Sequence, residues 1–386
     1  MKRVALMLFG VTDLSGGGGM ERFYSSFFNK YVAEENPFDL FVVGDATSIR
    51  YLTQHHFLAE HSNILSIPKE LSSNFKNHVQ FIFPLINILK QKNIDVLHIP
   101  TALSIYLPFL SIVRWLLPHI KLSFNVINCE IAPNYFSKNK HVPGIKSHRR
   151  YLQRIRFDGI LSWYKNIFSD DIKQTFRGKP YLFPVNYCFT ETDKFKPEEK
   201  QNHIVFAARL SLIKDPLFYL NAILILKTKQ PSLFSEWTFY LYGKGELEAE
   251  VKAFLKKNDL SKHVILGFTN KMNEVLNKSK LFISTQNHEN FTSISMLEAM
   301  ASGNAIIARN VGQTEYFVKD GKNGFLLEED TPECLSEKIL EYISTPSLQT
   351  KMSAESIHIA KNVHTYENFR QEINAYWANV AKQTEN

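Results

Sequence analysis

Cysteine is scarce in this chain of 386 residues, and the three that it has lie far apart. Cys129, Cys188 and Cys334 form no Cys-x-x-Cys pair and no cysteine–histidine spacing of the kind that binds zinc. Disulfide frameworks and structural zinc sites both need clustered or regularly spaced cysteines. The sequence therefore argues against both, and it favours a reducing compartment.

Long uninterrupted apolar runs are also missing. The opening Met1–Val11 places charge before apolar residues, as a signal peptide does, but its apolar run is short and no small-residue cleavage site follows it closely. The apolar run Ala102–Pro118 is the candidate for a membrane span. It contains Arg114 and is interrupted by Pro108, and neither residue suits a spanning helix. We expect a buried strand in the first stretch. In the second we expect a helix packed on a sheet, with peripheral membrane contact through its apolar face as the alternative.

Acidic residues are absent between Ile131 and Phe157, where the chain is strongly basic, and the whole chain carries a net charge of +7. The cations of this basic segment are Lys138, Lys140, Lys146, Arg149, Arg150, Arg154 and Arg156. A solvated loop and helix face would explain them, and so would a surface for anionic lipid headgroups or a diphosphate-bearing acceptor. Nucleic acid is the weakest choice of partner, because no recognition-module signature accompanies the charge.

Short apolar runs alternate with longer helical patterns along the whole chain. This alternation is typical of repeated βα units and predicts α/β domains with mostly parallel, doubly wound sheets. The polar stretch Thr190–Asn202 near the middle contains a proline, so we place a linker there. We expect two Rossmann-like domains, residues 1–192 and 193–365, that face each other across a cleft. A terminal helix within 366–386 is expected to pack back on the first domain.

In such folds, ligands bind beyond the carboxyl ends of the strands. The stretch GGGGMERF, residues 16–23, follows the first expected strand and precedes a helical pattern. Its glycines let the backbone approach a ligand, and the helix start offers free N–H groups to an anion. A flexible turn is one alternative. A dinucleotide fingerprint with Asp45 as the ribose acid is another, but that match is weak, because Glu21 stands where the third glycine belongs.

Two cations follow the expected strand HIVFA, in the stretch AARLSLIKDP. Arg209 and Lys214 fall on the loop that leads from this strand to a helical pattern. Two positive charges at the carboxyl end of a strand can neutralise a diphosphate and stabilise it as it leaves. Taken alone, however, an Arg and a Lys on a loop are more typical of ordinary solvated surface.

The stretch HENFTSISMLEAMASGN, residues 288–304, follows another expected strand and predicts a loop and then a helix. Thr292 or Ser293 suits the N-cap, and the glycine of the final ASGN suits the helix end. Free N–H groups near the cap would provide a second cradle for phosphate. Glu298 then lies inside the helix. Its spacing from Ser295 also fits a capping box, in which case its role is structural.

The motifs also occur in a telling order: a glycine loop, strand-RLxxxKD, YGKGELEAEV, a strand followed by ENFxxxxxLEAMASGNAIIA, and GxxEYFVKDGKNGFLL. In this order they resemble the retaining GT-B glycosyltransferases of family 4, the glycosyl transferases group 1. The resemblance is strong over Ile204–Leu327. It is looser in the N-terminal half, where the glycine loop and DVLHI carry it. Several ordered motifs are far more specific than any one of them.

The resemblance implies roles for residues of the second domain. Arg209 and Lys214 match the pair that binds the diphosphate, and Glu298 matches the glutamate that holds the ribose. The family's other glutamate contacts the donor sugar, and counting back from Glu298 with seven residues between places that position on Asn290. Glu289 is one residue early. Either Asn290 bonds the sugar through its amide, which we favour, or the loop bulges and Glu289 does so.

The resemblance also implies contacts outside these two motifs. Gly18 and Gly19 match the family's N-terminal glycine loop, and we expect backbone near Gly243 and Thr269 to recognise the base.

On the acceptor side we place His98, Asn125, Arg149 and Arg150. His98 ends DVLHI and matches a histidine often seen in the family, although a packed histidine explains it equally well. Asn125 falls near the point where the family often has another histidine. The two arginines belong to the basic segment.

Taken together, these features predict a retaining hexosyltransferase that moves a sugar from a UDP- or GDP-sugar to a hydroxyl of a sugar or lipid-linked sugar. Bacterial cell-surface polysaccharide or glycolipid synthesis is the expected setting. No metal or other cofactor is expected, because the two cations take that part. The expected location is the cytoplasm, with peripheral contact at the inner face of the plasma membrane. The alternatives are a catalytically silent GT-B nucleotide-binding scaffold, a sugar-nucleotide epimerase and a phosphorylase.

Overall fold

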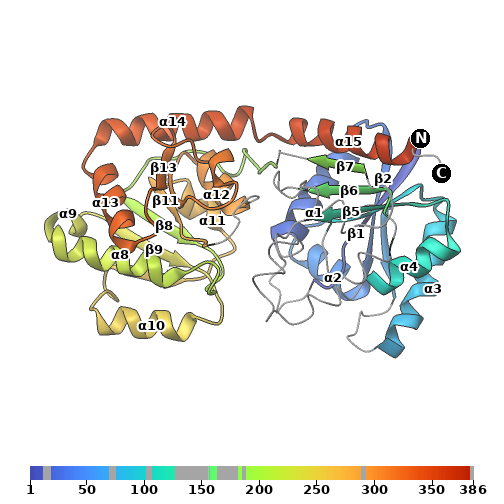
Figure 1. The fold of residues 1–386 in the computed structure, drawn as a ribbon, viewed down its shortest axis with the longest axis horizontal. Helices are drawn as coiled ribbons and strands as arrows, with labels where there is room; N and C mark the ends of the chain where they lie inside the picture. The colour runs from blue at the N-terminus through green and yellow to red at the C-terminus, as the bar shows by residue number, and fades with distance from the viewer. Residues whose placement is uncertain are drawn as a thin grey trace. The chain divides into compact units, whose positions relative to one another are not determined.

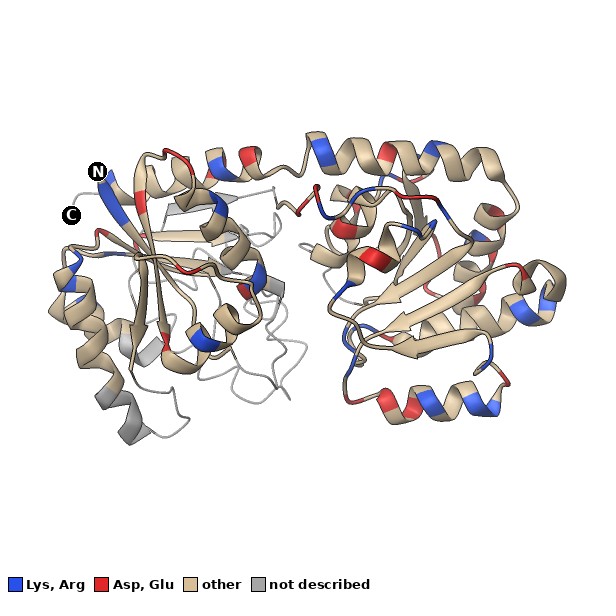
Figure 2. Cartoon of the chain, turned by 180° about the vertical axis from the view of Figure 1, so that it is seen from behind, with Lys and Arg blue, Asp and Glu red and all other residues tan. Residues whose placement is uncertain are grey.

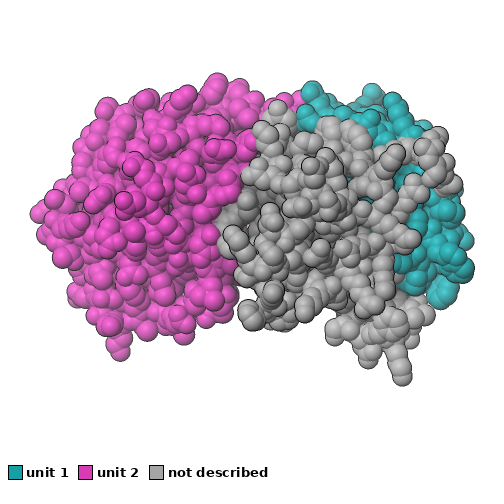
Figure 3. All heavy atoms as spheres, viewed as in Figure 1, with its two compact units in different colours: residues 1–186, 369–386 teal, residues 187–368 magenta. Residues whose placement is uncertain are grey.

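The computed structural model of the chain describes residues 1–11, 19–68, 75–100, 107–126, 155, 157–162, 181–184, 188–287 and 293–382. Within them, residues 19, 75–80, 107–109, 126, 162 and 181–184 are described by their backbone alone. The chain divides into two compact units, coloured teal and magenta in Figure 3. Unit 1 comprises Met1–Asn186 and Phe369–Asn386, and unit 2 comprises Tyr187–Asn368. The chain therefore passes between the units twice, first a few residues before the boundary expected at residue 192.

Unit 1 is built on a seven-stranded parallel sheet with the order β3-β2-β1-β4-β5-β6-β7 (Figure 1). Its strands are β1 (Lys2–Met7), β2 (Phe38–Asp45), β3 (Ile64–Ile67), β4 (Val96–Ile99), β5 (Lys121–Val126), β6 (Gly159–Ser162) and β7 (Tyr181–Pro184). Its described helices are α1 (Gly19–Val32), α2 (Ala46–Gln54), α3 (Phe75–Gln91) and α4 (Leu107–Leu116). The strand expected in the opening stretch is confirmed as β1. Its Val4, Ala5 and Leu6 are fully buried, as both faces of a parallel sheet require.

The last helix, α15 (Tyr366–Lys382), belongs to unit 1 from Phe369 onward. Phe369, Ile373, Tyr376, Trp377 and Val380 are fully buried on its inner face. The Trp377 ring lies 5.8 Å from Phe38 and 6.1 Å from Phe27 of the N-terminal segment, measured between ring centroids. The end of the chain thus completes the core of the unit that its beginning starts.

Unit 2 contains a six-stranded parallel sheet with the order β10-β9-β8-β11-β12-β13. Its strands are β8 (His203–Ala207), β9 (Thr238–Tyr242), β10 (Val264–Gly267), β11 (Leu281–Ser284), β12 (Ala305–Arg309) and β13 (Gly324–Leu327). Its helices are α8 (Pro216–Lys229), α9 (Pro231–Ser235), α10 (Glu248–Lys257), α11 (Met272–Leu276), α12 (Ile294–Ala301), the 3-10 helix η4 (Thr314–Tyr316), α13 (Pro332–Ile343) and α14 (Pro346–Asn362).

The polar stretch Thr190–Asn202 lies within unit 2 and is held to it. Lys200 Nζ donates to the backbone oxygens of Ser279 (2.5 Å) and Ser302 (2.6 Å), and Lys196 N donates to the side chain of Asn277 (3.1 Å). Burial lowers the pKa of Lys200 to about 7. The stretch expected to act as a linker is therefore a fixed part of the second unit.

Both sheets are parallel and doubly wound, so the predicted α/β class is confirmed. In each sheet the strand order reverses once, between β1 and β4 in unit 1 and between β8 and β11 in unit 2. Loops that leave the carboxyl ends of such a strand pair diverge to opposite faces, and the space between them is where ligands bind. None of the described helices combines the length and apolar character needed to cross a membrane.

Candidate functional site

The loop after β8, residues 208–215, carries both predicted cations and is fixed on one side by the loop after β9. Ala208 N donates to Tyr242 O (3.1 Å), and Leu210 N donates to Lys244 O (3.0 Å). A Cβ at Gly243 would lie 1.9 Å from the backbone oxygen of Ala208. A side chain at this position would force the two loops apart, so the glycine predicted to contact the base has a packing reason of its own.

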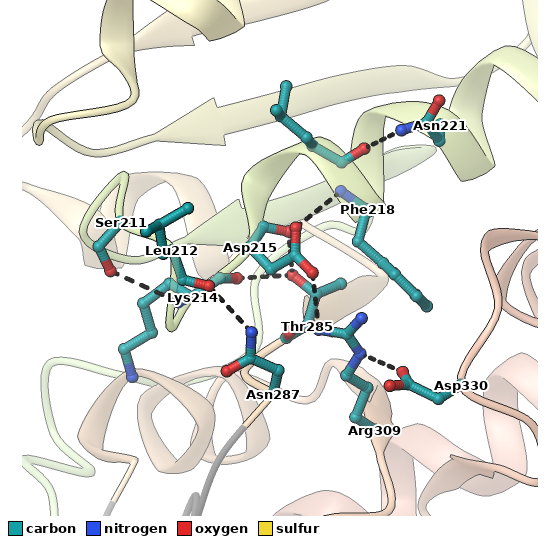
Figure 4. Close-up of polar contacts among 11 residues, drawn as sticks. Ser211, Leu212, Lys214, Asp215, Phe218, Asn221, Thr285, Asn287, Arg309 and Asp330 are labelled. Atoms are coloured by element: carbon teal, nitrogen blue, oxygen red, sulfur yellow. Dashed lines mark hydrogen bonds and ion pairs between the residues drawn. The ribbon is translucent and has the colours of Figure 1, made fainter. Parts of the chain in front are cut away.

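On its other side, the same loop is tied to the loop after β11 (Figure 4). Thr285 Oγ1 donates to the backbone oxygens of Lys214 (2.8 Å) and Asp215 (2.9 Å). Asn287 donates through its backbone N to Ile213 O and through its side-chain amide to Leu212 O, both at 3.0 Å. The backbone that carries Lys214 is therefore held by two neighbouring loops at the edge where the strand order reverses.

Arg309, the last residue of β12, connects the loop after β8 with the loop after β11 (Figure 4). Its guanidinium donates to Asp215 Oδ2 (2.9 Å) and to Thr285 O (2.7 Å), and it also pairs with Asp330. It stacks over the Phe218 ring at 3.8 Å from the centroid, and only 6% of the residue is exposed. A buried cation is tolerated when it is paired and hydrogen-bonded in this way.

Asp215 has a second task, because it is the N-cap of α8. It adopts a left-handed backbone conformation with φ of 47°, and its Oδ1 accepts from Phe218 N (3.3 Å), with Pro216 as the first helical residue. The sequence reasoning missed Asp215 and Arg309 as parts of the site. An Asp before a Pro is a recognisable helix start, which would have found the first of them.

Lys214 is half-buried, and its Nζ donates to the side-chain oxygen of Gln286. Burial and, to a smaller extent, the positive charge of Arg209 together lower the pKa of Lys214 to about 8. Arg209 itself is exposed. In the part of the chain that the structure describes, neither cation has a carboxylate within ion-pair distance. Two adjacent cations without a counter-ion are what an anionic ligand requires.

The helix α12 begins beside these cations. Ser293 is its N-cap, as predicted, and makes no side-chain bond to the helix N–H groups. Ser295 is then the second helical residue and not the cap, so the capping-box interpretation of Ser295 and Glu298 is wrong. Glu298 is half-buried in the middle of the helix. The helix ends at Ala301 with Ser302 as its C-cap, and Gly303 follows with a φ of 77°, which only a glycine adopts readily.

A small pocket opens between the ends of β8 and β11. Its walls include apolar residues such as Ala207 and Phe282. The polar residues that line it are Lys214, Ser284, Thr285, Gln286, Ser293 and Ser295. The structure thus brings the predicted Lys214 and Ser293 together, from two loops that are about 80 residues apart in the sequence. The N–H groups at the start of α12 add partial positive charge to the same place.

The positions predicted to contact the base lie on the loops that follow β9 and β10. Thr269 Oγ1 accepts from Lys271 N (3.0 Å), which closes the turn before α11. Phe268 is 53% exposed, and Lys244 Nζ lies 4.5 Å from its ring centroid. Of the positions predicted for the base, Thr269 therefore has a visible structural task in the turn.

The two predicted acceptor residues of unit 1 that the structure describes lie in its interior. His98 and Asn125 are both fully buried. His98 Nδ1 is 2.7 Å from Ser123 Oγ, which is itself 2.7 Å from the hydroxyl of Tyr376 on α15. Asn125 Nδ2 donates to the hydroxyl of Tyr24 at 3.0 Å. Burial lowers the pKa of His98 to about 3, so the imidazole is neutral and belongs to the packing between β4, β5, α1 and α15.

Asp45, the ribose acid of the weak dinucleotide alternative, is occupied as the N-cap of α2. It accepts from Ser48 N (3.1 Å), Ser48 Oγ (2.5 Å) and Gly10 N (3.2 Å). Gly19 is the first residue of α1. The remaining predicted residues lie outside the described part of the chain: Gly18, Arg149, Arg150, Glu289, Asn290 and Thr292. So does the basic segment apart from Ile155 and Phe157.

Comparison with known families assigns the second half of the chain. Residues 189–358 match the model of the family described as glycosyl transferases group 1. The second half of the chain is thus similar to the group 1 glycosyltransferases. The matched residues lie within unit 2 and include the loop of Arg209 and Lys214 and the helix of Glu298.

Individual proteins agree with the group 1 assignment. The poly(ribitol-phosphate) α-N-acetylglucosaminyltransferase of Staphylococcus aureus (strain COL) is 28% identical over 195 residues, which cover 50% of this chain and 35% of that protein. The chain spans about a third of the length of the first curated relatives that it matches.

Two solved structures match nearly the whole chain. Anabaena HepE in complex with UDP-glucose has a TM-score of 0.75 at 14% identity, and the match covers 98% of this chain and 100% of that one. A variant of S. aureus TarM in complex with fondaparinux, α-GlcNAc-glycerol and UDP has a TM-score of 0.74 at 13% identity, covering 99% and 100%. At such identities the likeness concerns the fold, which is GT-B. The predicted GT-B fold is confirmed.

Proposed function

We propose that this protein is a retaining glycosyltransferase that transfers a hexosyl group from a nucleotide-sugar to a hydroxyl acceptor without a metal ion. One observation carries the proposal. Lys214 is half-buried beside Arg209 and a helix N-terminus, where the described residues supply no carboxylate as a counter-ion. A nucleoside diphosphate has the charge and the size that such a site requires.

In this mechanism, Arg209 and Lys214 bind the diphosphate of the donor and stabilise the charge that it gains as it leaves. The bond between the anomeric carbon and the β-phosphate oxygen breaks, and a bond to the acceptor oxygen forms on the same face. The acceptor proton passes to an oxygen of the departing diphosphate. Preorganised cations of this kind are usually the largest catalytic contribution, because they need no rearrangement as charge develops.

Other residues are assigned to the parts of the donor. Glu298 holds the ribose, and the N–H groups near Thr292 and Ser293 contact phosphate. Asn290 contacts the sugar, with Glu289 as the alternative if the loop bulges. Gly18 and Gly19 bring the N-terminal glycine loop close to the donor.

Backbone near Gly243 and Thr269 meets the base. UDP- and GDP-sugars are the donors that we favour. HepE and TarM were solved with UDP-glucose and UDP, respectively, which supports the first.

The acceptor is proposed to be a sugar or a lipid-linked sugar in bacterial cell-surface polymer synthesis. The S. aureus relative is named for poly(ribitol-phosphate), which supports a polymer of this kind. The basic segment, including Arg149 and Arg150, would attract an anionic acceptor or the anionic inner face of the plasma membrane. A cytoplasmic enzyme at the inner face of the plasma membrane would meet both the anionic acceptor and the anionic lipid.

A thermal-shift panel with UDP-, GDP-, ADP- and dTDP-sugars tests the donor assignment. A donor present at about 100 times its dissociation constant adds about 2.7 kcal/mol to the free energy of unfolding. We expect a shift with the UDP- or GDP-sugar and none with the others, together with release of the free nucleoside diphosphate when an acceptor is added. Lack of a shift with all four donors, and of any nucleotide release, would contradict the proposal.

A further inference from the structure

Large apolar side chains are exposed on two neighbouring helices of unit 1. Phe83 on α3 is 60% exposed, and Ile112 and Trp115 on α4 are 38% and 78% exposed. Apart from Met1, they are the only large apolar residues with such exposure in the described part of this unit. Tryptophan is normally one of the more buried residues on average, so an exposed Trp beside an exposed Phe calls for a reason.

The exposed faces of these helices point the same way. α3 leads from β3 to β4 and α4 leads from β4 to β5, so both run in the same direction across the sheet. Right-handed crossovers in one direction lie on one face of a sheet, and the two helices pack against each other (Figure 1). Leu85 and Leu89 on α3, and Leu110 and Val113 on α4, are buried on the inner side. Phe83, Ile112 and Trp115 are therefore surplus to the core, and we call this outer surface the α3–α4 face.

The α3–α4 face is also free of negative charge. Neither helix contains an Asp or a Glu (Figure 2). Lys90 is exposed near the end of α3, and Lys92 follows just beyond it. Arg114 instead turns to Asp158, with which it forms an ion pair. The face thus combines apolar side chains with the exposed Lys90, for which no described carboxylate lies within ion-pair distance, and the partly exposed Lys92 lies just past its end.

We propose that the α3–α4 face rests on the surface of an anionic lipid bilayer. Aromatic residues suit the boundary between headgroups and acyl chains, and nearby lysines are attracted by anionic headgroups. A second copy of the chain is a poorer occupant. A two-fold contact would bring the same lysines together with no carboxylate in either helix to receive them. The inference extends the membrane part of the proposed function to a surface that the structure describes.

The test uses the full chain and vesicles of phosphatidylcholine alone or with phosphatidylglycerol, in a co-sedimentation assay. We expect binding to the anionic vesicles, weakened roughly tenfold or more in Trp115→Ser and in Phe83→Ser, because each change removes a large apolar side chain from the bilayer. Ile265→Ser is the matched control, since Ile265 is 45% exposed on β10 of unit 2. That variant should bind as the parent does.

A second measurement locates the contact. Brominated lipids should quench tryptophan fluorescence in the parent, and this quenching should be lost in Trp115→Phe. Binding that is unchanged in the Phe83/Trp115 double serine variant would overturn the proposal, as would equal binding to neutral vesicles. A dimer that Trp115→Ser dissociates, seen by light scattering, would assign the face to a second copy. The thermal shift with nucleotide-sugar, measured on the same variants, keeps this outcome separate from failure of the donor site.

Discussion

Each unit has one place where its strand order reverses, and the two places differ in chemistry. In unit 1, the described polar groups there include the neutral His98, Ser123 and Tyr376, which hydrogen-bond one another in the interior, and the buried Asn125, which donates to Tyr24. In unit 2, the corresponding edge carries Arg209 and Lys214, two cations that repel each other. The topology is the same, so it marks the edge but does not determine what binds there.

The difference is one of free energy. His98, Ser123 and Tyr376 hydrogen-bond one another, which lowers the free-energy penalty of burying them, although the nearby side-chain oxygen of Asn125 has no partner. Lys214 lies in a place that disfavours its charged form, and hydrogen bonds from the loop after β11 fix the backbone that carries it. An arriving diphosphate would remove that penalty. Under the proposed function, a ligand completes this edge of unit 2. The described network around His98 is instead bonded mostly within itself, and it leaves the side-chain oxygen of Asn125 without a partner.

The largest expected effect comes from removing the cations. Arg209→Ala and Lys214→Met should each lower turnover by about 100-fold or more, because a preorganised charge contact to the leaving group is lost. Unfolding temperature should change little. Lys252→Met is a matched control, since it breaks an exposed ion pair with Glu248 on α10. Near-normal turnover in both site variants would show that the two cations of unit 2 do not set its edge apart from that of unit 1.

The next effect concerns pH. The lowered pKa of Lys214 means that its cation exists below about pH 8 and is lost above it. Since a diphosphate binds the protonated form, UDP affinity should be constant at lower pH. It should fall by up to about tenfold per pH unit above pH 8. Calorimetric titrations across this range measure it.

Two variants sharpen the pH test. Arg209→Ala removes the repulsion that helps to lower the pKa of Lys214, so the midpoint of the fall should move to higher pH. Lys214→Met should abolish the fall altogether. A midpoint that stays in place in both variants would show that another group titrates.

The smallest effect tests the unit 1 network. Tyr376→Phe removes the hydroxyl that lies 2.7 Å from Ser123 Oγ, which should lower the stability of unit 1 by about 1 kcal/mol. UDP affinity should not change. The matched variant Tyr342→Phe removes a hydroxyl that donates to Lys280 O (2.8 Å) in unit 2. Hydrogen exchange should accelerate around β4 and β5 only in the first variant, and an effect of Tyr376→Phe on UDP binding would show that the network reaches the donor.

The fold was predictable because parallel strands need apolar residues on both faces. Runs such as VALMLF and NAIIA can therefore be recognised in the sequence as buried strands. The cations of the candidate site were predictable for a related reason, since Arg209 and Lys214 lie on the loop that follows such a run. The N-cap at Ser293 also has a local signal.

Other features depend on contacts between distant residues. Arg309 meets Asp215 across 94 positions, and nothing near either residue announces the pair. His98 ends a strand, and the sequence pattern does not distinguish an inward imidazole from one that faces a ligand. The spacing of Ser295 and Glu298 fits a capping box. The helix starts two residues earlier than that motif requires, so both residues lie inside it. Such features are decided by packing, which local patterns do not encode.

The course of α15 has a consequence for how the protein is made. Unit 1 needs Trp377 and Tyr376 for its core, yet the whole of unit 2, Tyr187–Asn368, leaves the ribosome before them. At typical rates of synthesis that interval lasts roughly ten to forty seconds. The half that is translated first is thus the last to be finished, with the rings of Phe27 and Phe38 uncovered in the meantime. A nascent chain of this protein should therefore engage chaperones through its beginning until its end arrives.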